Sequence, residues 1–438
     1  MNRRAHPIVA GILAGAALCA PRAQADMDFL EGRVDGSKLV LSADVVGGWY
    51  QSNDSWFGAS ETFLGANTDH WAEIGLAPAL TFETKTRGGG AIFAALSGVY
   101  TSTAGNDASG LTIGLTDTSA FTLEQGYVGW AAEDLFDRLE GDTLTITGGR
   151  LDYSIGSGLL MDDGGADGGD RGGWYLGLRK AFSESLVASL DSDTWLLEAF
   201  NVKNQPRAGG TQGQAYGANA ERKLGEDAAV GGTYMQVDSN VAGEAKLDVL
   251  SLRANWRAAN GLGLAGEYAD ESSSQIAATG YFAEVSYARD DRPWLPEFSY
   301  RYAHFDGDDL GTPKDERFRE IAYGFTDWGS WYQGEITGEY ALGNGNLDSQ
   351  RLRAQFTPLD GVTFNAMYYR FTLDQPARLS SSSRHWGDEY NFTLDWQVND
   401  NVYLVAVLGL LSPGDAAKRI TGGSDDWLHT MLNITYSW

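Results

Sequence analysis

The sequence predicts an all-β protein: a single transmembrane antiparallel β-barrel of about 18 strands behind a cleaved N-terminal signal peptide. Three observations support this prediction. Apolar and polar residues alternate along many short segments. No apolar run beyond the N-terminus approaches the roughly 18 residues of a membrane-spanning helix. The 438 residues include 56 Gly, 20 Tyr, 18 Phe and 14 Trp but 10 Pro, a composition that suits many strands with aromatic girdles better than helices.

The first 25 residues are typical of a secretory signal peptide. Arg3 and Arg4 form the positive region, residues 8–20 form an apolar stretch, and residues 23–25 form a small-x-small cleavage site. A short membrane anchor is the alternative, but the apolar run is too short to span a bilayer. We therefore expect 1–25 to be removed and 26–438 to form the barrel. Cys19, the one cysteine, lies inside the signal, so the mature chain has no disulfide and no thiol chemistry.

The charge balance excludes one class of partner. The signal carries three of the 32 basic residues and none of the 59 acidic ones, which leaves the mature chain at −30. Binding to nucleic acid needs a basic surface, so we expect no nucleic-acid partner. Acidic loops such as 304–309 account for much of this charge, so the net value does not give the sign of a pore.

Residues at the C-terminus show the alternation most clearly. Between 427 and 438, one face of an extended strand carries apolar residues and ends on Tyr436 and Trp438, while His429 and Asn433 lie on the other face. Segment 385–398 repeats the pattern, with Trp386 and Trp396 expected on the lipid side near the two interfaces. The same alternation predicts strands within 73–83, 250–257, 297–302, 332–340 and 351–356.

A soluble β-sandwich or β-propeller is the alternative fold. Either would bury its apolar residues together and would place fewer aromatic residues at strand ends. A barrel of about 18 strands instead encloses a water-accessible lumen, so the residues that line it decide the function.

The polar faces of the predicted strands carry both signs of charge. Arginines and carboxylates that face each other across a lumen can select solutes by charge and size, although such pairs can equally serve to stiffen the wall. The residues are Arg179, Arg253, Arg257, Arg301, Arg351 and Arg353, with Glu73, Glu83, Glu267, Glu284, Glu297, Glu335, Glu339 and Asp395.

The glycine-rich segment 148–174 is the densest polar cluster. The apolar parity flips at Gly148-Gly149, which predicts a β-bulge or a strand break. Three interpretations remain open for the residues beyond the flip: a loop folded into the pore, a Ca²⁺ site without the full EF-hand spacing, and a solvated loop. Residues 156–173 are a hypothetical gate. The segment carries Asp162, Asp163, Asp167 and Asp170 between glycines, and Arg150, Arg171 and Arg179 flank them.

This segment carries a resemblance to a known family. The run Gly149-Arg-Leu-Asp-Tyr-Ser-Ile-Gly-Ser-Gly158, with 163–174, 122–130 and 315–320, is similar to the alginate-export outer-membrane porins. The resemblance implies an 18-stranded monomeric barrel whose lumen is constricted by arginines and carboxylates, as in a member that passes alginate through an electropositive pore. By position, it implies these candidate constriction residues: Arg150, Asp152, Asp162, Asp163, Asp167, Asp170, Arg171 and Arg179. Here several glutamates lie at lumen parity, so a dominantly positive pore is not evident.

The predicted function is an outer-membrane channel for a polysaccharide or another polar or anionic solute. Its expected partners are outer-membrane lipid and lipopolysaccharide, the saccharide, and periplasmic export machinery, with no cofactor unless Ca²⁺ binds at 162–170. A small-solute diffusion porin is the alternative. An outer-membrane enzyme is a weaker one, because His70, His304, His385 and His429 lie near no recognisable serine motif. The chain is also too short for a plug domain and 22 strands.

Overall fold

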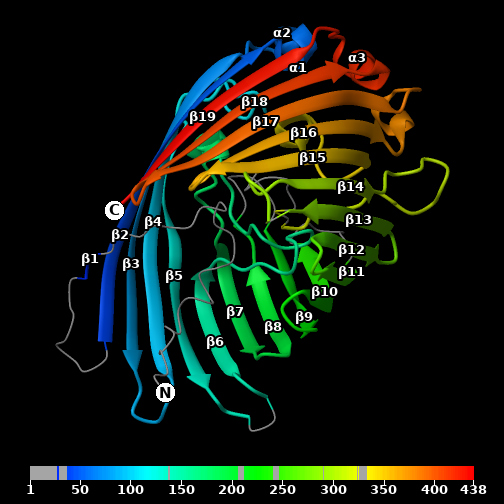
Figure 1. Ribbon diagram of the computed structural model, residues 1–438. Coiled ribbons are helices and arrows are strands. Elements are labelled where there is room, and N and C mark those ends of the chain that lie inside the picture. Colours follow the sequence, from blue (N-terminus) through cyan, green and yellow to red (C-terminus); the bar gives the residue numbers. More distant parts are fainter. Residues whose placement is uncertain are drawn as a thin grey trace.

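A computed structural model describes residues 27–28, 37–136, 139–205, 212–239, 246–289, 291–322, 324 and 333–438. The predicted signal peptide, 1–25, lies outside the described residues. Eighteen antiparallel strands, β2 to β19, pair in chain order, and β19 pairs with β2 to close the sheet into a barrel (Figure 1). The two-residue strand β1 (Met27–Asp28) adds to β2. Among the described residues, no helix is both long and apolar enough to cross a membrane.

The strands of the first half of the barrel have the following bounds: β2 (Ser37–Asn53), β3 (His70–Lys85), β4 (Ala91–Gly105), β5 (Ser119–Glu133), β6 (Thr143–Leu151), β7 (Phe182–Asp191), β8 (Trp195–Lys203), β9 (Gly213–Lys223) and β10 (Ala228–Ser239). Those of the second half are β11 (Leu247–Arg257), β12 (Leu262–Ser272), β13 (Ala277–Ala288), β14 (Glu297–Phe305), β15 (Leu347–Leu359), β16 (Val362–Leu373), β17 (His385–Asn399), β18 (Val402–Pro413) and β19 (Trp427–Ser437).

Short helices occupy several connections. They are α1 (Ser55–Gly58), α2 (Ser60–Phe63), η2 (Gly169–Arg171), η3 (Trp174–Leu176), the π-helical η4 (Gly334–Ala341), η5 (Pro376–Leu379) and α3 (Asp415–Thr421).

The two ends of the barrel differ in the length of their connections. At one end, β15 and β16 are joined by residues 360–361 and β17 and β18 by residues 400–401. At the other end, residues 152–181 join β6 to β7 and residues 306–346 join β14 to β15. Outer-membrane barrels have short periplasmic turns and longer extracellular loops, so the long connections mark the extracellular end.

Closure of the barrel rests on the C-terminal strand. The backbones of Ala43 and Trp438 exchange two hydrogen bonds of 2.8 and 2.9 Å. Along β19 the predicted alternation is confirmed: Ile434 and Tyr436 are 44% and 47% exposed on the outer surface, whereas His429 and Met431 are buried inside. A closed ring leaves no free sheet edge, which is the condition for a β-structure in lipid.

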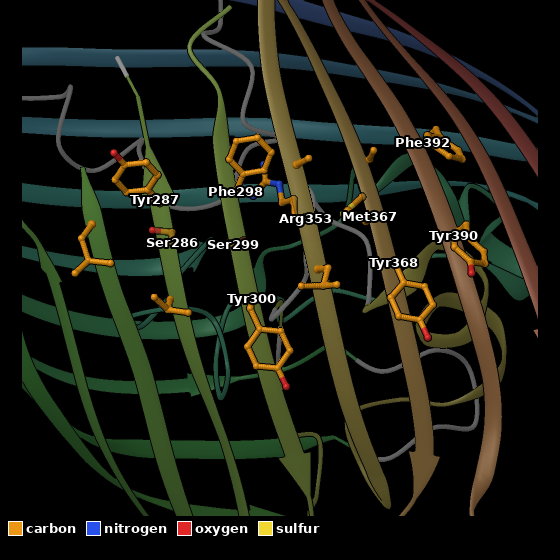
Figure 2. A pocket seen from close by; sticks show the side chains of 15 residues that line it. Ser286, Tyr287, Phe298, Ser299, Tyr300, Arg353, Met367, Tyr368, Tyr390 and Phe392 are labelled. Carbon is orange, nitrogen blue, oxygen red and sulfur yellow. The ribbon is translucent and has the colours of Figure 1, made fainter. Parts of the chain in front are cut away.

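The outer surface is apolar over most of its height. Figure 2 shows one part of it, where Tyr300, Tyr368, Tyr390 and Phe392 project from neighbouring strands. In an aqueous protein such a wall would aggregate, so its stable surroundings are the acyl chains of a bilayer.

Two predictions about strands are wrong. Trp386 does not face lipid: the β16–β17 register shifts beside it, and the extra residue turns its ring inward against Phe57. The segment predicted as a strand at 332–340 forms η4 inside the barrel, so Glu335 and Glu339 are not wall residues. Tyr332 lies outside the described residues.

The predicted irregularity at Gly148-Gly149 is confirmed as a register shift between β6 and β7 at Gly149. Gly149 has φ of 130°, and a Cβ there would come within 2.4 Å of the Gly126 carbonyl oxygen. A larger residue would therefore strain the point where β6 leaves the wall.

If the apolar residues of the outer surface face lipid, a charged substitution should lower the free energy of unfolding by an amount that depends on its depth in the membrane. Leu408 lies midway along β18 and is 43% exposed, so Leu408→Arg should lower the free energy of unfolding by about 2–4 kcal/mol. The matched control, Leu359→Arg beside the short β15–β16 turn, should cost roughly 0–1 kcal/mol. Urea unfolding in phospholipid vesicles measures both values. Equal costs would contradict this orientation of the wall.

Candidate functional site: two segments inside the barrel

The β6–β7 connection, residues 152–181, runs inside the barrel and is held by buried carboxylates of the wall. Glu73 of β3 accepts hydrogen bonds from the backbone N–H groups of Trp174 and Tyr175, at 3.2 and 3.0 Å, and from the Thr103 hydroxyl at 3.0 Å. On β5, Glu124 accepts from the N–H groups of Lys180 and Ala181, both at 2.7 Å. Each carboxylate replaces the water that these main-chain groups would otherwise bind.

A buried ion pair locks the same segment. Arg179 is 2% exposed, and its Nη1 lies 2.6 Å from Asp167 Oδ1. The guanidinium also donates to the hydroxyls of Thr101 and Thr122 and to two main-chain carbonyls of β4 and β5. With its donors used in this way, Arg179 fastens the segment to the wall and is not available to a passing solute.

The segment also reaches the opposite wall. The Ser157 hydroxyl donates to Glu267 Oε2 of β12 at 2.6 Å, and Ser251 of β11 donates to the other oxygen at 2.5 Å. Because Glu73 and Glu267 belong to walls on different sides of the barrel, residues 157–175 cross the lumen.

The described part of the β14–β15 connection around η4, residues 333–346, forms a second insertion. Glu389 of β17 accepts from the N–H groups of Ile336 and Thr337 in η4, at 2.8 and 2.9 Å. Tyr340 lies 3.0 Å from His429 Nε2, whose Nδ1 lies 3.0 Å from the Ser52 hydroxyl. This buried His–Ser contact serves packing between η4 and the wall.

The two insertions contact each other. Trp174 Nε1 donates to Glu339 Oε1 at 2.7 Å, and the Ala322 carbonyl accepts from the N–H groups of Asp162 and Asp163. Tyr175 packs against Tyr340 with ring centroids 5.3 Å apart. The constriction is therefore a joint structure of two long connections.

Arginines gather on the wall formed by β13 to β15. Arg351 and Arg301 approach the same carboxylate, Glu284, at 2.9 and 3.9 Å. Arg353 donates to the amide oxygens of Asn365, at 2.9 Å, and Gln355, which are neutral partners. Three guanidinium groups thus lie close together, and the hydrogen-bond partners of Arg353 are uncharged amides. This part of the lumen wall is therefore rich in positive charge.

The two other arginines predicted for the lumen, Arg253 and Arg257, each pair with a carboxylate. Arg253 of β11 bonds to Glu221 at 3.2 Å and to the oxygens of Asn219 and Thr233. Arg257 lies 3.4 Å from Glu297 and is exposed near the periplasmic end. Each of these arginines lies beside a carboxylate that balances its charge.

Other residues predicted for the constriction have mostly local partners. Arg150 lies 3.9 Å from Glu124 and bonds to Gln205, and Asp152 accepts from Gln125. Arg171 donates to the Ala166 carbonyl within its own segment, while Asp170 is exposed.

The loop aspartates face protein groups rather than one another. Asp162 lies 3.9 Å from Lys180, Asp167 pairs with Arg179, and Asp163 accepts from the Gly165 N–H. Burial raises the pKa of Asp163 to about 7, so this carboxyl is only partly ionised near neutral pH. The Ca²⁺ site stays a prediction without support from this geometry.

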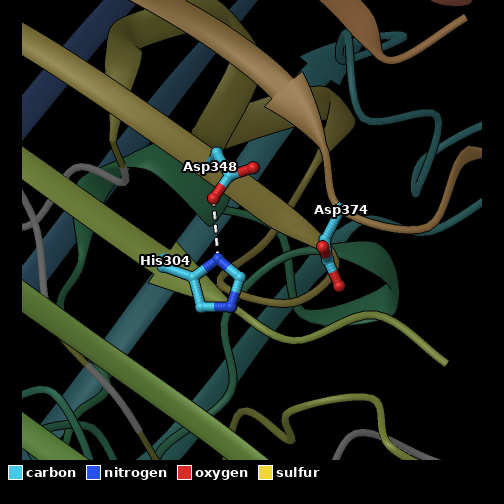
Figure 3. Close-up of side chains that lie close together, drawn as sticks. All are labelled: His304, Asp348 and Asp374. Carbon is cyan, nitrogen blue, oxygen red and sulfur yellow. Dashed lines mark hydrogen bonds and ion pairs between the residues drawn. The ribbon is translucent and has the colours of Figure 1, made fainter.

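Among the described residues, one group of side chains has metal-ligand spacing: His304, Asp348 and Asp374, at the extracellular end of β14 to β16 (Figure 3). His304 Nδ1 lies 2.6 Å from Asp348, and Nε2 lies 2.8 Å from Asp306. Both ring nitrogens thus face carboxylates, as in an imidazolium that donates twice, and Arg384 bridges Asp348 and Asp374. In this structure the group is an ion-pair network of His304, Arg384 and the neighbouring aspartates.

Sequence reasoning missed the second insertion and the anchoring role of Glu124 and Glu389. Polar and apolar residues alternate along 333–340, a pattern that is typical of a strand. Here the polar residues lie instead in a helical turn that is surrounded by polar groups of the wall. The feature of the sequence that could have revealed the second insertion is the length of the connection 306–346. A connection of this length is unusual in a barrel unless it has a function.

Solved structures with the same architecture are outer-membrane porins. OccK5 (OpdH) of Pseudomonas aeruginosa is 12% identical with a TM-score of 0.55, covering 93% of this chain and 99% of its own. A double mutant of OccD1 (OprD) is 11% identical with a TM-score of 0.58, covering 95% and 98%. OpdK of P. aeruginosa, solved with vanillate, is 13% identical with a TM-score of 0.55, covering 93% and 100%. At these identities the likeness establishes the fold alone. No curated protein matches the sequence.

The closed barrel and its apolar outer wall, together with a family match, define an outer-membrane channel rather than an enzyme. A family profile described as "Alginate export" matches residues 191–427, which is more than half of the chain. The protein belongs to the alginate export family, as the resemblance of its glycine-rich segment implied.

Loss of the Arg179 anchor should release the first insertion. Removing one partner from a buried ion pair costs about 3–5 kcal/mol, so Arg179→Gln should make residues 152–181 open to limited proteolysis while the barrel stays intact. Asp170→Asn, at an exposed position of the same segment, is the control and should stay protected. Identical digestion of the two variants would show that Arg179 is not the anchor.

Removal of the insertion should widen the channel. Replacing residues 156–173 by a short Gly-Ser linker deletes the part that crosses the lumen, so single-channel conductance in planar bilayers should rise. The control replaces residues 376–380, an exposed turn at the rim, and should leave conductance unchanged. Unchanged conductance in the first variant would refute an occluding role.

Proposed function

We propose that the channel passes a polar, anionic solute of the acidic-polysaccharide class across the outer membrane. The observation that carries the proposal is the group of three arginines, Arg301, Arg351 and Arg353, on the lumen wall beside Glu284. Fixed positive charge in a narrow lumen raises the local concentration of anions and lowers the barrier to their passage.

The anchoring geometry supports a division of roles along the lumen. Arg179 has its partners inside the protein, whereas Arg353 is half-buried and bonds to neutral amides. An incoming carboxylate can replace a neutral amide oxygen at Arg353 without leaving a buried negative charge unpaired. We infer that Arg353 is the solute-facing arginine of the site, and that the buried Arg301 and Arg351 add positive charge behind it.

The same proposal includes delivery and partners. The segment 1–25 directs Sec-dependent export and is removed before the barrel inserts, and periplasmic export machinery presents the solute at the end of the barrel that carries the short turns. Two observations support transport in this direction: the chain belongs to the alginate export family, and the connections are short at one end of the barrel and long at the other.

A small-solute porin is the second candidate, and the two insertions favour it. The first insertion bonds to Glu339 of η4 and to Ala322 inside the barrel, and these contacts narrow the lumen. Equal permeation by short and long acidic oligosaccharides supports the export channel, whereas a sharp cut-off at small solutes supports the porin.

Ion selectivity tests the role of the arginines. The wild-type channel should prefer chloride to potassium, and Arg353→Gln should lower the permeability ratio about twofold, since one charge at ~8 Å in water is worth about 0.5 kcal/mol. Reversal potentials under a salt gradient measure the ratio. Arg222→Gln, on the outer surface, is the control. Cation preference in the wild-type protein would contradict the proposal.

A further inference from the structure

The outer surface of β14 to β17 is organised in rows that change from apolar to charged toward the extracellular end. Antiparallel pairing places Phe298, Ala354, Ala366 and Phe392 side by side. The next row along the strands contains Tyr300, Leu352, Tyr368 and Tyr390. Rows on one face are two residues, or about 6.6 Å, apart.

The row that contains Phe298 and the row that contains Tyr300 line a recess of about 560 Å³ in the lipid-facing wall. Its floor is low because Ala354 and Ala366 face each other between the larger rings of Phe298 and Phe392. Its lining is apolar and its depth in the wall places it among acyl chains.

The tyrosines mark the boundary between hydrocarbon and headgroups. In Figure 2 the hydroxyls of Tyr300, Tyr368 and Tyr390 all point along the strands toward the extracellular end. The Tyr368 hydroxyl donates to Asp388 at 2.7 Å, and Tyr302, one row further, donates to Asp348 at 2.7 Å. Aromatic rings with one apolar and one polar end are typical of membrane interfaces.

Charged and polar groups fill the rows above this boundary. Tyr302, Gln350, Arg370 and Asp388 form the next row, and Arg370 is exposed. At the rim, Arg384 bridges Asp348 and Asp374 with its side chain 55% exposed. Two arginines therefore lie on the outer face directly beyond the recess, within a field of hydroxyl, amide and carboxylate groups.

We propose that the outer surface of β14 to β17 binds one acylated, phosphorylated glycolipid of the outer leaflet. One acyl chain fills the recess over Ala354 and Ala366, and the headgroup phosphate binds Arg370 and Arg384. Guanidinium groups bind phosphate through paired, charge-assisted hydrogen bonds. The neighbouring Gln350 and Asp388 suit sugar hydroxyls, which donate as well as accept, and this mixture distinguishes a glycolipid from a simple phospholipid.

Native mass spectrometry of the complete barrel in detergent tests the site, with bis-phosphorylated lipid A and phosphatidylglycerol as the two probes. The wild-type protein should retain one lipid A in preference to phosphatidylglycerol. Two variants each remove one half of the site: the floor-filling variant Ala354→Leu/Ala366→Leu and the headgroup variant Arg370→Ala/Arg384→Ala. The affinity of each variant for lipid A should fall about tenfold or more.

Matched controls use the same substitutions elsewhere on the outer face. Ala94→Leu on β4 and Arg222→Ala on β9 should bind lipid A as the wild type does. The heat-modifiable gel shift reports folding, and single-channel currents of the floor and headgroup variants should be unchanged, so this test is independent of the solute. Wild-type retention by both variants, equal loss in the controls, or equal retention of phosphatidylglycerol would overturn the proposal.

Discussion

The constraint on which the whole structure depends is closure of the sheet in a medium without water. Every backbone group of the wall must pair with a neighbouring strand, since an unpaired group in hydrocarbon costs several kcal/mol. The pairing of β19 with β2 meets this condition and fixes the alternation of side chains. Apolar residues then face lipid, and the polar ones of the same strands are forced into the lumen.

Closure of the barrel also encloses carboxylates, and the two insertions supply hydrogen bonds to them. Inward carboxylates such as Glu73, Glu124 and Glu389 are enclosed by the wall and need hydrogen-bond donors. The main-chain N–H groups of residues 174–181 and 336–337 supply them. The wall and the insertions therefore satisfy each other, and the constriction is rigid because its anchors are buried. Arg353 differs from these anchors because it bonds to neutral amides, which is why the proposed selectivity rests on the arginine group that contains it.

Sequence patterns predicted the wall well and the interior partly. Period-two alternation identifies β17 and β19 because lipid selects residue types on one side of each strand. It fails at Trp386, where a register shift turns an aromatic residue inward, and at 333–340, where alternating polar residues form η4. The glycine-rich segment at 148–174 was recognised as polar and foldable. Its partners on β3, β5 and β12 could not be predicted, because contacts across a lumen depend on strand register and not on local sequence.

The two insertions should cover some positions of the lumen wall and leave others open to solute. The mature chain is predicted to lack cysteine, so single cysteines can be placed at Val99, buried on β4 beside Arg179, and at Gln355, half-buried on β15 beside Arg353. Labelling with an anionic thiol reagent added to the open channel distinguishes them. We predict fast labelling with loss of current at Gln355→Cys and protection at Val99→Cys; equal labelling, or faster labelling at Val99→Cys, would contradict this division of the lumen.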